Sequence, residues 1–245
     1  MHMIILSIGM PRAGSGWFYN LSNDLVVANG GQNARHIRQR YHLQSILTEV
    51  NCNIGALTLP RLIAVLIPSF MGNTYVIKAH SKPTPIALSF IQRGWILPTH
   101  IFRDPRDAML SAMENGQKAI ERGSPNAFSP FATFDNALKF MSGYVHTTLS
   151  WLECKFALQT HYEDLLLNFD DESNHLIDFL SIKKNNPEIL KVIEKYRPEK
   201  VQTEQRGLHF SHGRIGRFRQ KMDKEQQEVL VNTLGPYLER MGYAV

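Results

Sequence analysis

Four basic side chains stand where apolar segments end, and their types suit the handling of an anionic group. Lys78 and His80 are two positions apart at the end of one segment, so on a strand both side chains would lie on the same face. His can accept a proton from a hydroxyl near neutral pH, and Lys can neutralise charge on a leaving oxygen. Arg12 and Arg103 follow two other apolar segments. A lone His at the end of a strand is usually a surface or capping group. The presence of Lys78, Arg12 and Arg103 at similar positions favours a functional role for His80.

The apolar segment at residues 3–8 leads into the loop Gly9-Met10-Pro11-Arg12-Ala13-Gly14-Ser15-Gly16-Trp17. A buried strand that runs through a glycine-bearing turn into a helix directs backbone N–H groups and the positive end of a helix dipole at one spot, which favours phosphate. Gly9 and Gly14 have nearly the spacing of a nucleotide P-loop, but Ser15-Gly16 replaces the expected Lys-Ser/Thr pair. The loop therefore predicts an anionic nucleotide bound without triphosphate chemistry.

A second motif, residues 102–111, closes an apolar segment and opens a helix. Helix capping explains three of its residues, Asp104, Pro105 and Asp107. Capping does not explain Arg103 at the strand end or Ser111 two turns into the helix. Anion binding and a purely structural role both remain open for this motif.

The elements that must position these residues form an alternating pattern. Strand-like segments occur at Met3–Ile8, Tyr75–Ala79, Ile96–Phe102 and Phe156–Thr160. Helix-like segments occur at Gly16–Val27, Arg35–Val50, Thr84–Arg93, Arg106–Asn115, Phe134–Trp151, His175–Leu180 and Lys224–Leu234. This order predicts a mainly parallel sheet covered by helices on both faces. Ligands of such sheets lie beyond the carboxyl ends of the strands, so Arg12, His80 and Arg103 should face a common crevice.

Composition narrows the possible partners. The 245 residues, 43% of them hydrophobic, suit one domain over residues 1–245. The net charge of +5 is scattered, which favours small acidic ligands over nucleic acid. Two cysteines in no metal-binding spacing, no recognisable signal peptide and no transmembrane segment together predict a cytoplasmic protein.

Together the motifs resemble those of the sulfotransferase family that uses 3′-phosphoadenosine 5′-phosphosulfate (PAPS), a branch of the P-loop fold. The segment from Pro11 to Trp17 looks like the family's 5′-phosphosulfate loop. The resemblance implies that Arg12 and the backbone N–H groups around Gly14 to Trp17, in a loop that includes Ala13, Ser15 and Gly16, hold the 5′-phosphate. It also implies that Trp17 packs on the adenine.

The same resemblance assigns the other motifs. Arg103 and Ser111 look like the family's 3′-phosphate pair, and Lys78 and His80 like its catalytic Lys and His. Tyr162 resembles a further nucleotide-contacting Tyr after a late strand. The matches run in family order from residue 3 to about 180, with a weaker one towards the C-terminus. They imply an α/β, three-layer P-loop-like fold with a mainly parallel central sheet flanked by helices, and a reaction that needs no metal.

Two positions depart from the family pattern. Gly16 stands where many members have Thr, so only its backbone N–H remains for the 5′-phosphate. The triplet Ser211-His212-Gly213 replaces the Arg-Lys-Gly that cytosolic members place on the 3′-phosphate. We expect Gly213 and Arg214, with the charges of Arg217 and Arg219, to take over that contact; a solvated basic loop is the alternative.

An absence bears on the general base. Members that sulfate glycosaminoglycans or protein tyrosines resemble one another in using a Glu some way beyond the phosphate loop. No Asp or Glu occurs from Leu25 to Thr48, so His80 is the expected base, as in cytosolic small-molecule enzymes. We expect the basic stretch Arg35–His42 to be solvated and the apolar stretch Leu57–Met71 to lie in the core, with acceptor contacts as the alternative for each.

The sequence thus predicts transfer of a sulfuryl group from PAPS to the hydroxyl of a small-molecule, sugar or lipid acceptor. His80 is the expected general base, and Lys78 and Arg12 are expected to stabilise charge on the leaving phosphate. A small-molecule kinase of the P-loop class, which would bind ATP with magnesium, and a nucleotide-binding module without activity are the alternatives. No motif identifies the acceptor or the oligomeric state.

Overall fold

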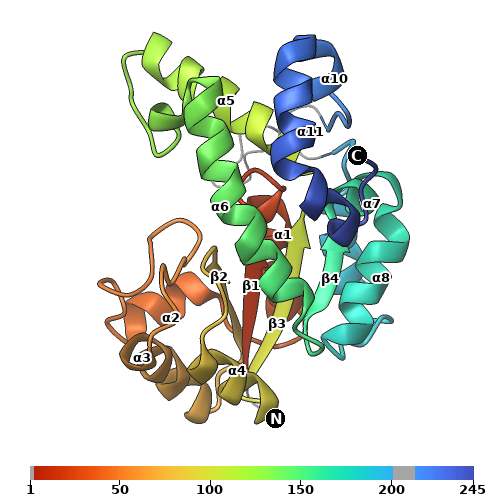
Figure 1. Ribbon diagram of the computed structural model, residues 1–245. Helices are drawn as coiled ribbons and strands as arrows, with labels where there is room; N and C mark the ends of the chain where they lie inside the picture. The colour runs from red at the N-terminus through yellow and green to blue at the C-terminus, as the bar shows by residue number, and fades with distance from the viewer. Residues whose placement is uncertain (1–2, 201–212) are drawn as a thin grey trace.

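The computed structural model describes residues 3–200 and 213–245, and its centre is a four-stranded parallel sheet (Figure 1). The strand order is β2-β1-β3-β4. The strands are β1 (Ile4–Gly9), β2 (Tyr75–Ala79), β3 (Ile96–Phe102) and β4 (Leu158–His161). β1 lies between β2 and β3 and is buried throughout, as expected for an apolar central strand with helices on both faces. Because every pairing is parallel, the carboxyl ends of all four strands meet at one edge.

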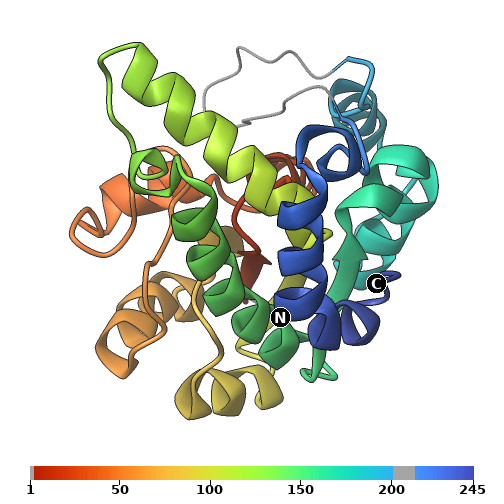
Figure 2. The ribbon, with the colours of Figure 1, turned by 45° about the horizontal axis from the view of Figure 1, so that its top comes forward.

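Helices cover both faces of the sheet (Figures 1 and 2). The helices are α1 (Ser15–Ala28), α2 (Ala34–Arg40), α3 (Leu59–Phe70), α4 (Pro85–Gln92), α5 (Pro105–Glu121), α6 (Phe134–Leu152), α7 (Tyr162–Leu167), α8 (Phe169–Phe179), α9 (Pro187–Lys195), α10 (Phe218–Lys221) and α11 (Lys224–Leu238). Two short 3-10 helices are η1 (Ser129–Phe131) and η2 (Glu239–Met241). One buried cluster joins α5, α6 and α11 to the end of β3, and another joins α1 to α7, α8 and α9. The expected three-layer α/β architecture is thereby confirmed.

The four predicted strands and most of the predicted helices are present, several with shifted bounds, whereas α3, α7, α9 and α10 were not predicted. The fourth strand begins at Leu158 rather than Phe156, α5 runs on to Glu121, and α8 starts at Phe169. The predicted helix Arg35–Val50 is wrong, because α2 ends at Arg40. Residues 41–53 instead form turns, which we call the 41–53 segment.

Helix α2 ends in a left-handed turn: His42 has a φ of 55°, and the N–H of Leu43 bonds to the carbonyl oxygen of Arg38 at 2.9 Å. Two arginines of α2 then hold the segment that follows. Arg38 Nε donates to the carbonyl oxygen of Leu47 at 2.7 Å, and Arg35 Nε donates to that of Val50 at 2.8 Å. Two carbonyl groups of the irregular segment are thus satisfied by side chains. Leu43 and Leu47 still reach the core from this irregular backbone. The prediction that Arg35 and Arg38 are merely solvated is therefore wrong.

The apolar stretch Leu57–Met71 is only half in the core, contrary to expectation. In α3, Leu62, Val65 and Leu66 are buried, whereas Leu59 and Ile63 are exposed. Within the two described ranges, no helix combines the length and apolar character needed to cross a bilayer.

Candidate active site

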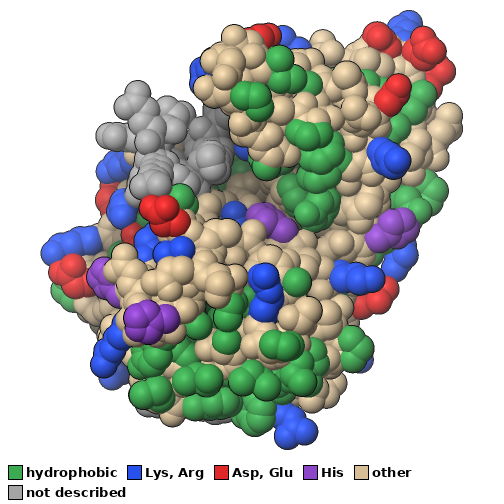
Figure 3. Space-filling model, turned by 90° about the vertical axis from the view of Figure 1, so that its left-hand side faces the viewer, with side chains coloured by type: hydrophobic (Ala, Val, Ile, Leu, Met, Phe, Trp, Pro, Cys, Tyr) green, Lys and Arg blue, Asp and Glu red, His purple; other side chains and the backbone are tan. Residues whose placement is uncertain are grey.

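A cavity of about 570 Å³ opens beyond the carboxyl edge of the sheet. Its wall contains most of the residues that the sequence singled out: Arg12, Gly14, Ser15, Gly16, Lys78, His80, Arg103, Ser111 and Tyr162. The space-filling view shows a hollow on this side of the molecule with histidine and basic side chains at its floor (Figure 3). The common crevice expected from the strand ends is therefore present.

The loop between β1 and α1 is built for close approach to an anion. A Cβ on Gly9 would lie 2.2 Å from the Cβ of Ser15, so only glycine lets the strand end pack against the start of α1. Gly14 is the N-cap residue with a φ of 72°, and it has no side chain with which to cap the helix. The first turn carries no acidic residue. The N-terminus of α1 therefore faces the cavity without a negative group of its own.

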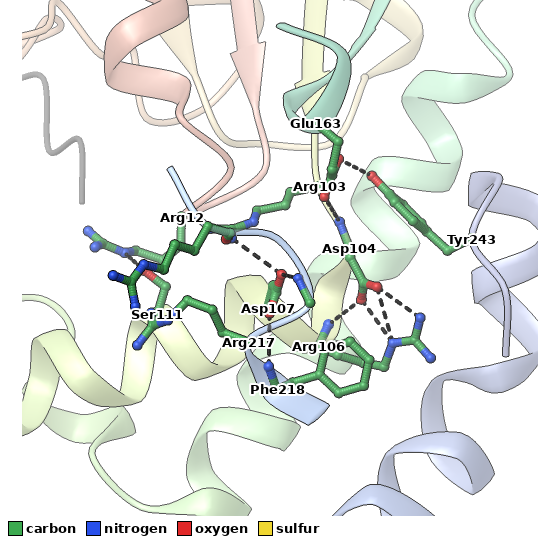
Figure 4. Close-up of polar contacts among 12 residues, drawn as sticks. Arg12, Arg103, Asp104, Arg106, Asp107, Ser111, Glu163, Arg217, Phe218 and Tyr243 are labelled. Carbon is green, nitrogen blue, oxygen red and sulfur yellow. Dashed lines mark hydrogen bonds and ion pairs between the residues drawn. The ribbon is translucent and has the colours of Figure 1, made fainter. Parts of the chain in front are cut away.

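Arg12 turns its side chain across the mouth of this loop. Its backbone has a φ of 66°, a left-handed conformation that is rare for residues other than glycine and typical of strained functional loops. Its Nε donates to Ser111 Oγ at 3.1 Å (Figure 4). Its guanidinium lies 5.1 Å from the ring centre of Phe128. Burial, with a smaller effect of Arg103, lowers the pKa of Arg12 to about 10. The side chain stays charged at neutral pH, and a bound anion would relieve its desolvation.

Arg103 is a second buried cation on the same wall. Its Nη2 donates to the carbonyl oxygen of Arg214 at 2.7 Å, and its guanidinium lies 4.5 Å from the ring centre of Tyr162. The carboxylate of Asp107 is 3.4 Å away, at the limit of a useful hydrogen bond. Arg103 Nε has no hydrogen-bond partner among the described residues. An unsatisfied donor on a buried cation is costly, and an anion would reduce that cost.

Asp107 does not serve as the capping-box partner that the sequence suggested. Asp104 alone caps α5, by accepting from the backbone N–H of Arg106 at 2.9 Å. Asp107 instead accepts from the backbone N–H groups of Gly216, at 2.6 Å, and Phe218, at 3.1 Å (Figure 4). It thus fastens the segment 214–218 beside Arg103. The cap is local, whereas this bond depends on residues more than a hundred positions away.

Lys78 and His80 share the cavity wall, as their spacing predicted. Burial, together with the charge of Arg12, lowers the pKa of Lys78 to about 8. Burial and then the charge of Lys78 lower the pKa of His80 to about 3. The imidazole is therefore neutral at physiological pH. Its Nδ1 bonds to the carbonyl oxygen of Gly9 and must carry the hydrogen, which leaves Nε2 as the basic nitrogen.

Tyr162 and Trp17 take different places. Tyr162 lies on the wall and packs so close to the loop that a Cβ on Gly14 would be 2.7 Å from its ring. Trp17 is fully buried: its Nε1 donates to the carbonyl oxygen of Tyr196 at 3.0 Å, and its indole stacks on Phe169 with ring centres 5.9 Å apart. An adenine could meet Trp17 only after its covering side chains move.

Besides Trp17, three further expected cofactor contacts do not lie on the cavity wall. Ala13 is buried, and its backbone N–H donates to the carbonyl oxygen of Met10 at 3.2 Å. Gly213 and the exposed Arg214 are also off the wall, and Arg214 contributes its carbonyl oxygen to Arg103. Arg217 is paired with Glu114 rather than left free for a ligand. Ser211 and His212 lie outside the described residues.

The sequence interpretation missed two parts of the wall. One is an aromatic group from η1, α6 and the loop before them, comprising Phe128, Phe131, Phe140 and Tyr144. The other is the end of the 41–53 segment, comprising Thr48, Glu49, Val50, Asn51 and Asn53. Glu49 comes one residue after the acid-free stretch on which the choice of His80 rested. A search for acidic residues that extended one position further would have found Glu49. The aromatic rings, in contrast, are brought together only by the fold.

The support behind Arg103 and Asp104 comes from the end of the chain. Arg106 forms an ion pair with Asp104 at 2.8 Å and also donates to the carbonyl oxygen of Ala244 at 2.7 Å. Tyr243 donates to Glu163 at 2.8 Å, and Glu163 accepts from the backbone N–H of Asp104 at 3.2 Å (Figure 4). These bonds fix the turn between β3 and α5 that carries Arg103.

Comparison with known proteins places this geometry in context. The family model described as the sulfotransferase domain matches residues 4–242. The structure of a mouse sulfotransferase, SULT7A1, complexed with PAP is similar, with 14% identity, a TM-score of 0.60, and coverage of 96% of this chain and 85% of that one. A retinol dehydratase in complex with androsterone and the inactive cofactor PAP is similar at 17% identity and a TM-score of 0.58, with 96% and 80% covered. At these identities the structures establish a shared fold. No curated protein matches the sequence.

Proposed function

The chain belongs to the sulfotransferase family, and from this premise we propose that it moves a sulfuryl group from PAPS to the hydroxyl of an acceptor. The observation that supports the proposal most is the meeting of an uncapped helix N-terminus with three buried or half-buried cations and a neutral His in one cavity. Such a site suits a ligand with several phosphate or sulfate charges.

The residues present fit the nucleotide part of PAPS. In our proposal the loop from Arg12 to Gly16 binds the 5′-phosphosulfate through its backbone N–H groups and the Arg12 side chain. Arg103, with its unsatisfied Nε, and Ser111 bind the 3′-phosphate. Tyr162 lies between the two and would contact the nucleotide. The adenine contact assigned to Trp17 requires a rearrangement, because the indole is enclosed.

PAPS would supply an activated sulfuryl group whose bond to the 5′-phosphate breaks during transfer. The new bond forms between the acceptor oxygen and sulfur, and the electron pair of the old bond stays on the phosphate. Nε2 of His80 accepts the hydroxyl proton as the acceptor oxygen attacks. Lys78 and Arg12 stabilise the charge on the departing phosphate, so catalysis rests on positioning and electrostatics.

The lowered pKa values support these roles. A neutral His80 is ready to accept a proton, and the negative charges of a bound nucleotide would raise its pKa from about 3 towards a more useful range. The same charges would raise the pKa of Lys78 from about 8 and keep it cationic. Burial is the main cause of both lowered pKa values, and the charges of Arg12 and Lys78 add to it; a bound nucleotide would offset the share due to these cations.

The acceptor would enter between the aromatic group and the end of the 41–53 segment. The rings offer an apolar wall, with Phe131 and Phe140 stacked at 4.0 Å between ring centres. The opposite wall offers the polar side chains of Glu49, Asn51 and Asn53. We infer a small-molecule acceptor with an apolar body and polar substituents. A cytoplasmic location belongs to the same proposal, since Cys52 and Cys154 are both unpaired.

Two measurements test the proposal. Calorimetry should show tight binding of adenosine 3′,5′-bisphosphate (PAP) and weak binding of magnesium-ATP. Transfer of radiolabelled sulfate from PAPS to a broad panel of phenols, alcohols, sugars and lipids should then reveal activity. Preference for magnesium-ATP would instead favour a kinase, and PAP binding without transfer to any acceptor would favour a non-catalytic module.

A further inference from the structure

One face of α3 is apolar and open to solvent. Five side chains form it: Leu59, Ile63, Ile67, Phe70 and Met71, each between 46% and 66% exposed. The first four recur at intervals of four and three residues, so they lie along one side of the helix. Leu62, Val65 and Leu66 face inwards and already anchor the helix to the core. The exposed apolar side chains are therefore not needed to hold α3 on the core, and an exposed apolar patch of this kind indicates an interaction surface.

The apolar stripe continues onto Arg93 and Trp95, which follow helix α4. Phe70 contacts Trp95 edge to face, with ring centres 5.3 Å apart, and the guanidinium of the exposed Arg93 lies 5.5 Å from the centre of the Trp95 indole. A row of aliphatic side chains that ends in Trp and Arg is typical of segments lying at a membrane surface. We call Leu59, Ile63, Ile67, Phe70, Met71, Arg93 and Trp95 the α3 face.

The charge around the α3 face is unbalanced. Glu49 is the only acidic residue from Leu25 to Arg103, and it lies on the cavity wall. The same stretch contains eight Lys and Arg, of which Arg40, Lys82 and Arg93 are exposed. Arg40 lies near the end of α3, because it stacks on Tyr41, whose hydroxyl accepts a hydrogen bond from Asn73. Exposed cations in a stretch with one carboxylate favour a negatively charged partner. A second copy of this face would instead set like charges against each other.

We propose that the α3 face docks on a membrane surface that contains anionic lipids. The apolar side chains enter the boundary between headgroups and acyl chains, while Arg93 and nearby cations contact lipid phosphates. Figure 3 faces the side of the molecule on which Figure 1 draws α3, at the lower left. In Figure 3, hydrophobic side chains gather below the hollow. The cavity mouth would then lie close to the bilayer. This surface is separate from the transfer site, so the inference does not depend on the proposed reaction.

Co-sedimentation with vesicles tests the proposal. Wild-type protein should bind vesicles of phosphatidylcholine with phosphatidylserine more tightly than vesicles of phosphatidylcholine alone, and added salt should weaken the binding. The double variant Ile67→Ser/Phe70→Ser should lower partitioning by at least about tenfold. Arg93→Gln should lower it about fivefold, on anionic vesicles only.

The matched control is Leu190→Ser on α9, because Leu190 and Phe70 are both 61% exposed. It should leave vesicle binding unchanged. Circular dichroism and PAP affinity, unchanged in every variant, would show that the fold and the nucleotide site are intact. Absence of vesicle binding, or equal binding by the double variant and wild type, would overturn the proposal. A dimer that the double variant splits, without vesicle binding, would assign the face to self-association. A protein that binds vesicles but not PAP would contradict the proposed function and leave this inference standing.

Discussion

His80 and Gly9 are joined by a hydrogen bond from the imidazole Nδ1 to the backbone carbonyl oxygen. The bond ties the end of β2 to the first residue of the phosphate loop on β1. It also selects the tautomer, because the carbonyl can only accept, so Nε2 is left without a hydrogen. The candidate base and the candidate phosphate loop are thus oriented by the same contact.

Replacing His80 by Ala should lower kcat by about 10²-fold or more, because the acceptor hydroxyl would lose its general base. PAP affinity, measured by calorimetry, should stay nearly intact. Glu49→Gln is the comparison, since Glu49 is the carboxylate on the opposite wall. Turnover near wild type in His80→Ala, together with a large loss in Glu49→Gln, would transfer the role of base to Glu49.

The pH dependence of kcat/KM should reflect the free enzyme. His80, with a pKa of about 3, is already neutral in mildly acidic solution, so no acidic limb is expected between about pH 5 and 7. Lys78 loses its proton as the pH rises through its pKa of about 8, so kcat/KM should fall above that value. In kcat this fall should move to higher pH, because the bound nucleotide raises the pKa of Lys78. An acidic limb near the ordinary pKa of His would contradict the geometry described here.

Arg103→Ala should weaken PAP by about 10- to 100-fold, the usual effect of losing a hydrogen bond to a charged group. Binding of 5′-AMP should change much less, because that ligand has no 3′-phosphate. The ratio of the two dissociation constants is the measurement. Arg214→Ala is the control for the segment behind Arg103, which uses only the backbone oxygen of Arg214. Equal losses for PAP and 5′-AMP would refute the 3′-phosphate assignment.

Gly9→Ala should destabilise the protein by about 1–3 kcal/mol, because its Cβ would overlap the Cβ of Ser15. It should weaken PAP as well, since α1 must shift away from the strand end. The matched control is Gly143→Ala on the exposed side of α6, where a Cβ meets nothing within 4 Å. That variant should gain about 0.5–1 kcal/mol in urea unfolding. A similar change in both variants would show that close packing at Gly9 has no importance.

Arg38→Ala should raise KM for the acceptor several-fold while the dissociation constant of PAP stays constant. Its Nε holds the carbonyl oxygen of Leu47, directly before the residues that form one wall of the cavity. Arg40→Ala, on the same helix, removes an exposed cation that stacks on Tyr41 and should leave both constants unchanged. A loss of PAP affinity in Arg38→Ala would mean that the 41–53 segment also supports the nucleotide.

Much of the fold could be predicted because its signals are local. The apolar runs that became β1, β2 and β3 are followed by turn and capping residues, and parallel strands bring their ends together wherever the helices lie. Lys78 and His80 share a wall for the same reason. The burial of Trp17 could not be predicted, because the residues that enclose it, Phe169 and Tyr196, lie far along the chain. The partners of Arg38 and of Asp107 likewise depend on contacts that no local pattern records.

The bonds from Arg103 and Arg106 to the carbonyl oxygens of Arg214 and Ala244 have a consequence for the synthesis of the chain. The strands, α1 and the phosphate loop are complete once Leu158–His161 has been made, but the partners that support the turn after β3 are synthesised later. Contacts across such long separations form late, because loop closure must come first. We therefore expect the nascent chain to acquire its sheet early and its nucleotide affinity only after residues 214–244 have been synthesised.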